Sequence, residues 1–212
     1  MRKPSSIAVA AVVLIVFSAA LSTAWLVHGA ARTVVAVKPS AVSPQVGEAF
    51  TVNITVSDVE NLYALDVLLT WNASILRVQS VQTLLGVESH SGGVLHETLP
   101  DAAVYIVENN ISQEAGEYHL VATSVAPAPS FNGSGTIATI TFTVLSTGRT
   151  ALILSSELAD YNPEGSNPIN HEDVSGTVEA LIPEFPATFA LTVLMLVTAT
   201  VALVYARMGK KK

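Results

Sequence analysis

Residues 47–72 read GEAFTVNITVSDVENLYALDVLLTWN, and this stretch decides the fold. From position 50 apolar and polar residues alternate strictly, which is typical of a β-strand with one buried face. Turn-forming residues at 58–61 predict a break, and a second alternating run then predicts another strand. The residues expected to face the core are Phe50, Val52, Ile54, Val56, Leu65, Val67, Leu69 and Trp71. The stretch therefore predicts two strands of a β-sandwich.

The charge balance of the middle of the chain limits its partners. The chain has 212 residues, no cysteine and a formal net charge of −7. Between residues 33 and 182, three basic residues stand against 16 acidic ones, so this segment carries a formal charge of −13. Nucleic-acid binding requires clustered Lys and Arg side chains against phosphate. We therefore exclude nucleic acid as a partner and expect core packing, without disulfides, to stabilise the segment.

Both ends of the chain predict export and membrane attachment. Residues 1–31 have a basic start, an uncharged apolar run and a small-residue end, as a signal peptide does; an uncleaved signal anchor is the alternative. Residues 187–206 are uncharged and predict a transmembrane helix, with the basic residues of 207–212 inside. We expect a single-pass protein of the cell membrane after signal cleavage, with its middle segment extracellular.

Further strands are predicted at short intervals, with no convincing helix between them. They lie at 33–37, 75–81, 102–107, 118–125, 138–144, 150–154 and 174–181. Together with the two strands of the opening stretch they make nine. An all-β chain with strands at this spacing favours a β-sandwich.

Several short segments, in this order and spacing, resemble the cohesin domain, the receptor half of the cohesin–dockerin pair. They are VKP at 37–39, VGE at 46–48, NLYA at 61–64, WN at 71–72, GSGTIATITF at 133–142, LILSS at 152–156 and GTV at 176–178. The resemblance covers residues 32–181. It implies a nine-stranded jelly-roll sandwich and a non-enzymatic module that binds a dockerin-like protein at the cell surface.

The resemblance also implies where a partner would bind. Cohesins bind dockerins largely through one sheet face, and Asp66 matches a position where a carboxylate or amide faces the partner. We therefore place the partner-binding residues on the outward side of the second strand, at Ala64, Asp66, Leu68 and Thr70. The alternative for Asp66 is a solvated charge that keeps a sheet face from aggregating.

Residues 182–186, IPEFP, resemble the PEF-type C-terminal sorting signals of archaeal surface proteins. The resemblance implies that an archaeosortase cuts near Pro183 and transfers the protein to a lipid. The alternative is a permanent membrane helix behind a proline-stiffened stalk.

Four Asn-x-Ser/Thr triplets lie in the middle segment, each a hypothetical acceptor for N-linked glycan. Their asparagines are Asn53, Asn72, Asn110 and Asn132. The alternation of the first strand points Asn53 away from the core. The expectation is a glycoprotein.

Residues 160–165, DYNPEG, place oxygen ligands at alternate positions before a glycine, as the front of a calcium loop does. Asp160, Asn162 and Glu164 are the candidate ligands, although the closing acid is out of place. An ordinary acidic turn is the alternative. No other cofactor is expected, since the histidines lack a zinc-site spacing.

Three classes of function remain open for the middle segment. The first is a protein-binding module of the cohesin type. The second is a structural or adhesive envelope component, including a carbohydrate-binding module, because jelly rolls also bind polysaccharide. The third, a glycosidase, needs two carboxylates across a cleft, and no nucleophile motif supports other catalysis. We expect no enzymatic activity.

Overall fold

The computed structural model describes residues 32–97, 104–182 and 187–208. Ten strands and one helix lie in these ranges. They are β1 (Thr33–Lys38), β2 (Ala41–Val42), β3 (Ala49–Thr70), β4 (Leu76–Thr83), β5 (Tyr105–Ser112), β6 (Glu117–Thr123), β7 (Phe131–Val144), β8 (Gly148–Asp160), β9 (His171–Val174), β10 (Gly176–Ala180) and α2 (Ala187–Met208).

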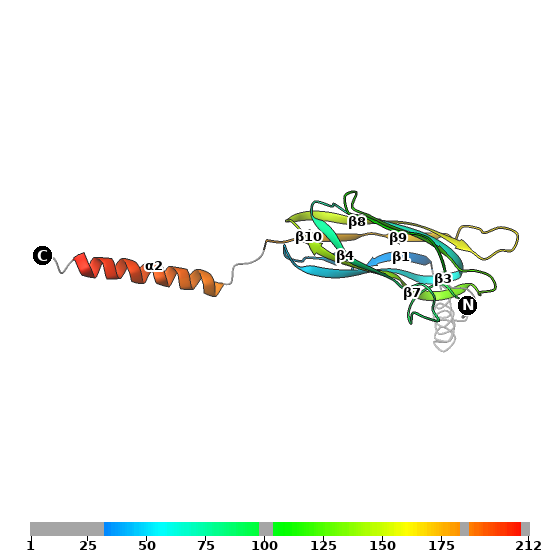
Figure 1. The fold of residues 1–212 in the computed structure, drawn as a ribbon, viewed down its shortest axis with the longest axis horizontal. Coiled ribbons are helices and arrows are strands. Elements are labelled where there is room, and N and C mark those ends of the chain that lie inside the picture. Colours follow the sequence, from blue (N-terminus) through cyan, green and yellow to red (C-terminus); the bar gives the residue numbers. More distant parts are fainter. Residues whose placement is uncertain (1–31, 98–103, 183–186, 209–212) are drawn as a thin grey trace, which may run out of the picture.

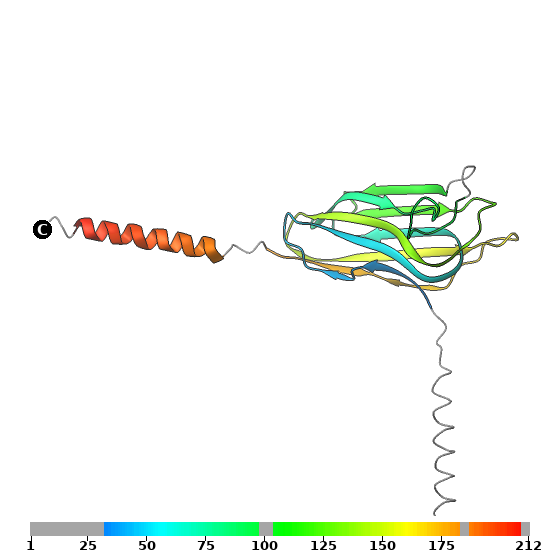
Figure 2. The ribbon, with the colours of Figure 1, turned by 90° about the horizontal axis from the view of Figure 1, so that it is seen from below.

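Strand β3 is 22 residues long and belongs to both layers of the sandwich. Its first half lies between β1 and β7, and its second half lies between β6 and β8. One layer therefore has the order β9-β1-β3-β7-β4, and the other has the order β2-β10-β8-β3-β6-β5. Figures 1 and 2 show the two layers packed along their length.

The predicted core positions of β3 are confirmed. Val52, Ile54, Leu65, Val67 and Leu69 have at most 2% of their surface exposed. Burial of such side chains contributes about 1.5–3 kcal/mol each to the driving force for folding. The alternation of the sequence thus fixes which side of each half of β3 faces the core.

Aromatic rings close one end of this core. Phe142 stacks on Phe50 with ring centroids 5.6 Å apart and meets the edge of Trp71 at 5.1 Å. The indole N–H of Trp71 donates to the carbonyl oxygen of Leu76 at 3.2 Å. Phe50 itself is only partly buried, because it lies at the start of its strand.

The predicted break at 58–61 is wrong, because β3 continues through it. Asp58 and Asn61 have positive φ angles of 53° and 60°, and the pairing with β7 shifts register on both sides. Two β7 side chains replace the missing ladder bonds: the Asp58 N–H donates to Ser134 Oγ, and the Asn61 N–H donates to Asn132 Oδ1. The turn-forming residues therefore make bulges within one strand.

Other predicted boundaries are also corrected. The described residues form ten strands rather than nine: the segment predicted at 174–181 is divided between β9 and β10, and the short β2 was not predicted. β7 begins at Phe131, well before the predicted start of this strand at 138. β5 continues to Ser112, beyond its predicted end at 107, while positions 102–103 of its prediction lie outside the described residues.

Parts of both chain ends lie outside the described residues. The predicted signal segment 1–31 and residues 183–186 of the PEF-like segment lie outside the described residues, as do residues 209–212 of the basic tail. The last 22 described residues form α2, whose side chains are described at 191–202. Within the described parts of the chain, no helix is long and apolar enough to cross a membrane.

Candidate functional site

The predicted partner-binding residues lie together on one surface, formed by the outward side chains of β8, the second half of β3, β6 and β5. We call this surface the outer face. Asp66 stands opposite Val121 of β6 and Glu157 of β8. Leu68 stands opposite His119 and Ser155. Ala64, Asp66, Leu68 and Thr70 are all partly exposed, as the alternation predicts.

A histidine joins two carboxylates at the centre of the outer face. The Nε2 atom of His119 lies 2.8 Å from Oδ1 of Asp66, and its Nδ1 atom lies 3.2 Å from Oε2 of Glu108 on β5. The pKa of His119 is raised above 6.5, chiefly by the hydrogen bond to Asp66, and burial opposes this shift only in part. The imidazole ring of His119 thus links β3, β5 and β6, and the two carboxylates favour its protonated, cationic form.

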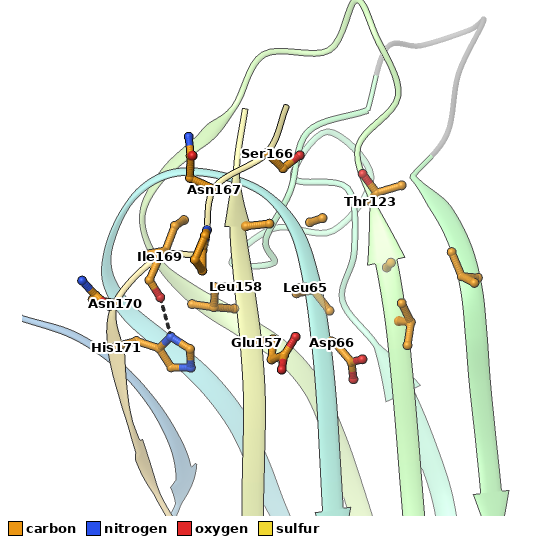
Figure 3. Close-up of a pocket in the computed structure, with 16 residues that line it drawn as sticks. Leu65, Asp66, Thr123, Glu157, Leu158, Ser166, Asn167, Ile169, Asn170 and His171 are labelled. Carbon is orange, nitrogen blue, oxygen red and sulfur yellow. Dashed lines mark hydrogen bonds between the residues drawn. The ribbon is translucent and has the colours of Figure 1, made fainter. Parts of the chain in front are cut away.

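A pocket of about 680 Å³ opens on the outer face near one end of the sheet (Figure 3). It extends from Val107 of β5 across β6, β3 and β8 to the segment 166–171. Ala64 and Ala159 contribute small apolar side chains, and Asp66 and Glu157 contribute carboxylates. Glu157 has no hydrogen-bond or ion-pair partner within the described part of the chain.

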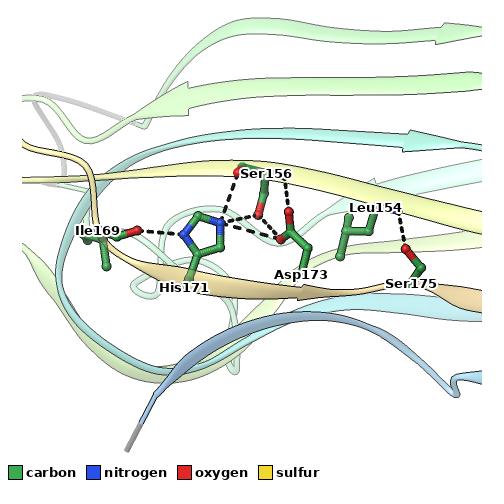
Figure 4. Close-up of polar contacts among 6 residues, drawn as sticks. All are labelled: Leu154, Ser156, Ile169, His171, Asp173 and Ser175. Atoms are coloured by element: carbon green, nitrogen blue, oxygen red, sulfur yellow. Dashed lines mark hydrogen bonds and ion pairs between the residues drawn. The ribbon is translucent and has the colours of Figure 1, made fainter.

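Strand β9 is held beside β8 by side chains. The Ser156 N–H donates to Asp173 Oδ2 at 2.8 Å, and the Leu154 N–H donates to Ser175 Oγ at 3.1 Å (Figure 4). β9 forms its backbone ladder with β1, so these side chains supply acceptors that a ladder with β8 would otherwise supply.

Ser156, His171 and Asp173 lie close together but lack the geometry of a catalytic triad. The Ser156 hydroxyl donates to Asp173 Oδ1 at 2.6 Å, whereas the Nδ1 atom of His171 lies 2.7 Å from the Ile169 carbonyl oxygen. In a triad the carboxylate contacts Nδ1 of the histidine and orients it toward the serine. The Nε2 atom of His171 also lies 3.1 Å from the Ser156 carbonyl oxygen. The cluster therefore serves to attach β9 to β8.

The loop with the calcium candidates uses its oxygens internally. Asp160 Oδ1 accepts the Asn167 N–H at 2.6 Å, and Asn162 Oδ1 accepts the Glu164 N–H at 3.0 Å. Among the described residues, no group of three or more His, Cys, Asp or Glu side chains could hold a metal ion. Calcium binding by this loop stays a prediction, with the acidic turn as its alternative.

The four candidate glycosylation sites differ in their surroundings. Asn53 Oδ1 accepts the Thr139 hydroxyl, Asn72 Oδ1 accepts the N–H of Ser74, and Asn132 Oδ1 caps the bulge at Asn61. Asn110 is exposed on β5, opposite His119, and its side chain has no hydrogen-bond partner among the described residues. Their glycosylation remains a prediction.

A family model described as the cohesin domain matches residues 35–180, which is most of the chain. The chain belongs to the cohesin family. Cohesin domains are binding modules rather than enzymes. A search of the curated proteins finds no relative of this cohesin.

Solved cohesins share its fold at low sequence identity. A non-cellulosomal cohesin from the archaeon Archaeoglobus fulgidus is 18% identical, with a TM-score of 0.50, over 71% of this chain and 92% of that one. The seventh ScaB type I cohesin from Pseudobacteroides cellulosolvens is 18% identical, with a TM-score of 0.53, over 73% and 95%. The cohesin in a complex of Coh-OlpA with Doc918 from Clostridium thermocellum is 14% identical, with a TM-score of 0.53, over 71% of this chain and 100% of that one.

Sequence reasoning placed four residues on the outer face and missed their neighbours. His119, Glu108 and Glu157 come from three other strands, so the pairing register alone brings them beside Asp66. The alternation of β6 and β8 marks His119 and Glu157 as outward-facing. It does not show which positions stand opposite each other.

Proposed function

We propose that this cohesin domain binds a dockerin-type protein through the outer face. The main support is the pocket, which runs across four strands of that face to the segment 166–171. Neighbouring strands lie about 4.8 Å apart, so five adjacent segments span about 19 Å. An α-helix of about 13 residues has the same length. The outer face can therefore receive a helix laid across its strands.

Comparison with other cohesins supports a protein partner. The Clostridium thermocellum cohesin and the sixth cohesin of Acetivibrio cellulolyticus scaffoldin B were solved in complex with dockerins. The acidic side chains on the outer face, Asp66, Glu108 and Glu157, further favour a partner surface that bears basic groups, since complementary charge steers association.

We also propose that the domain is displayed outside the cell from a C-terminal membrane anchor. The support comes from the sequence: a signal-like start, an uncharged segment at 187–206 and a basic tail. β10 ends at Ala180, opposite Gly148 at the start of β8, while Glu157 lies nine residues further along β8. A strand of that length covers about 30 Å. Anchoring after β10 would hold the pocket away from the membrane.

A binding experiment with the full chain in detergent tests the proposed partner. Dockerin-type domains encoded in the same genome would be expressed, labelled and titrated against it, with cell-wall polysaccharide columns run in parallel. Saturable one-to-one binding of a dockerin supports the proposal. Retention on polysaccharide without dockerin binding would favour the envelope or carbohydrate-binding alternative.

Display is tested on whole cells. Protease added outside should cleave the domain in intact cells, and mass spectrometry should show a mature N-terminus after residue 31. An intact Lys212 terminus would show that the PEF-like segment is not processed. Protection of the domain until the cells are ruptured would contradict extracellular display.

A further inference from the structure

The pocket has two chemically different parts. Ala64, Ala159 and Val121 contribute small or aliphatic side chains from three adjacent strands, and Ile169 lies on the segment that borders β8. Asp66 on β3 and Glu157 on β8 line the same pocket, and Figure 3 shows their carboxylates on neighbouring strands. An occupant that fills this space must present apolar surface and a charged or polar end together.

The two carboxylates stand directly opposite each other in the β3–β8 ladder. Like charges at directly opposite positions destabilise a sheet. Of the two oxygens of Asp66, His119 contacts Oδ1, and the side chain of Glu157 has no hydrogen-bond or ion-pair partner in the described ranges. No Lys or Arg is among the described residues that line the pocket. Within a concave site the uncompensated charge of Glu157, next to the second oxygen of Asp66, attracts cations more strongly than on an open surface.

We propose that this part of the pocket, the β3–β8 slot, receives one arginine side chain of the protein partner. The inference rests on the proposed function and specifies the partner's chemistry. The aliphatic stem of arginine packs on Ala64, Ala159 and Val121, as long basic side chains commonly do. Its planar guanidinium has five N–H donors, enough to reach Glu157 and the free oxygen of Asp66 together. A lysine offers one compact charge and matches a two-carboxylate site less well.

The segment 166–171 holds one side of the slot in place. The Asn167 N–H donates to Asp160 Oδ1, and the Ile169 N–H donates to the Leu158 carbonyl oxygen at 2.7 Å. The Nδ1 atom of His171 lies 2.7 Å from the Ile169 carbonyl oxygen. A border fixed in this way lowers the cost of ordering the site when an arginine enters.

The test uses two small probes of nearly the same size and shape, one with a cationic guanidinium and one with a neutral ureido group that has fewer N–H donors. N-acetyl-arginine amide and its neutral analogue N-acetyl-citrulline amide would be titrated into the full chain in detergent micelles, with the methyl groups of Ala64, Val121 and Ala159 followed by NMR. We expect saturable shifts with the arginine probe and binding at least about five-fold weaker for citrulline, the size expected for a partly exposed ion pair. Equal affinities, no saturation, or shifts confined to other surfaces would overturn the slot.

Two matched variants test whether the arginine probe binds in the slot. Glu157→Gln keeps the shape of the slot and should weaken the arginine probe about five-fold. Glu117→Gln removes a carboxylate from the same face, opposite Thr70 and outside the pocket, and should leave the affinity unchanged within about two-fold. An equal loss in both variants would show a general effect of charge and would overturn the slot.

The experiments distinguish an error in the arginine-binding proposal from an error in the proposed dockerin-binding function. A dockerin that binds the full chain and loses its affinity in Leu68→Arg, but not in Glu157→Gln, leaves the proposed function standing and overturns the slot. Selective binding of the arginine probe with no dockerin captured supports the guanidinium preference and contradicts the proposed function.

Discussion

His119 and Asp66 connect β6 to β3 through a contact of 2.8 Å between Nε2 and Oδ1 in the middle of the outer face. The two residues are diagonal neighbours, because His119 stands opposite Leu68. The other ring nitrogen faces Glu108 at 3.2 Å. A cation held between two carboxylates lowers the negative charge of the face where the partner is proposed to bind.

The charge of His119 depends on pH. The folded pKa of His119 is raised above its ordinary value of 6.5, so the stability gained from these contacts is fully present below pH 6.5. It is lost as the pH rises through the folded pKa. NMR titration of the His119 ring should show a lower pKa in Asp66→Asn than in the wild type. Glu117→Gln serves as the control on the same face. An unchanged pKa in Asp66→Asn would contradict the contact.

The same titration has a consequence for binding. Deprotonation of His119 removes a positive charge from the outer face, so a basic partner should bind more tightly as the pH rises through the folded pKa. Affinities measured on both sides of that pKa at constant ionic strength would check the direction. Weaker binding at the higher pH would argue against a basic partner surface.

The attachment of β9 predicts a stability difference between two neighbouring acids. Asp173→Ala removes the acceptor of the Ser156 N–H and hydroxyl and should lower the free energy of unfolding by about 1–3 kcal/mol. Glu172→Ala removes only an exposed ion pair with Arg32 and should cost at most about 1 kcal/mol. Urea denaturation of both variants measures the difference. Equal losses would show that the Asp173 contacts do not attach β9.

Gly116 and Gly92 both have positive φ angles, 67° and 78°, but differ in the space around them. A Cβ atom at Gly116 would lie 2.2 Å from the Trp71 carbonyl oxygen, whereas one at Gly92 would meet nothing within 4 Å. Gly92→Ala should therefore cost about 1–2 kcal/mol from backbone strain alone. Gly116→Ala should cost clearly more. Similar unfolding free energies for the two variants would contradict the close approach of Gly116, in the turn between β5 and β6, to the Trp71 carbonyl oxygen.

The burial pattern of β3 could be predicted because alternation is a local property of the sequence. Val52 and Leu65 face the core as expected. The break at 58–61 could not be resolved in this way, because the local signal for a bulge is the same as for a turn. What continues the strand is the donation of two backbone N–H groups to Ser134 and Asn132, more than 70 residues away.

The candidate site was predictable only in part for the same reason. The alternation of β3 and the family resemblance together located Asp66 and Leu68 on one face. The partners of Asp66 depend on the register of β6 and β8, which is set by long-range pairing. The cluster of Ser156, His171 and Asp173 likewise forms only when β9 lies beside β8.

The central claim is that the outer face binds the partner, and one pair of variants of the full chain in detergent tests it most directly. Leu68→Arg introduces a long charged side chain in the middle of this face, whereas Thr51→Arg introduces the same side chain at an exposed position of β3 in the other layer. Calorimetric titration with a dockerin that binds the wild type should show at least about 30-fold weaker binding for Leu68→Arg, as for a central contact residue. It should show a change within about two-fold for Thr51→Arg. Unchanged affinity in Leu68→Arg, or an equal loss in both variants, would contradict the account.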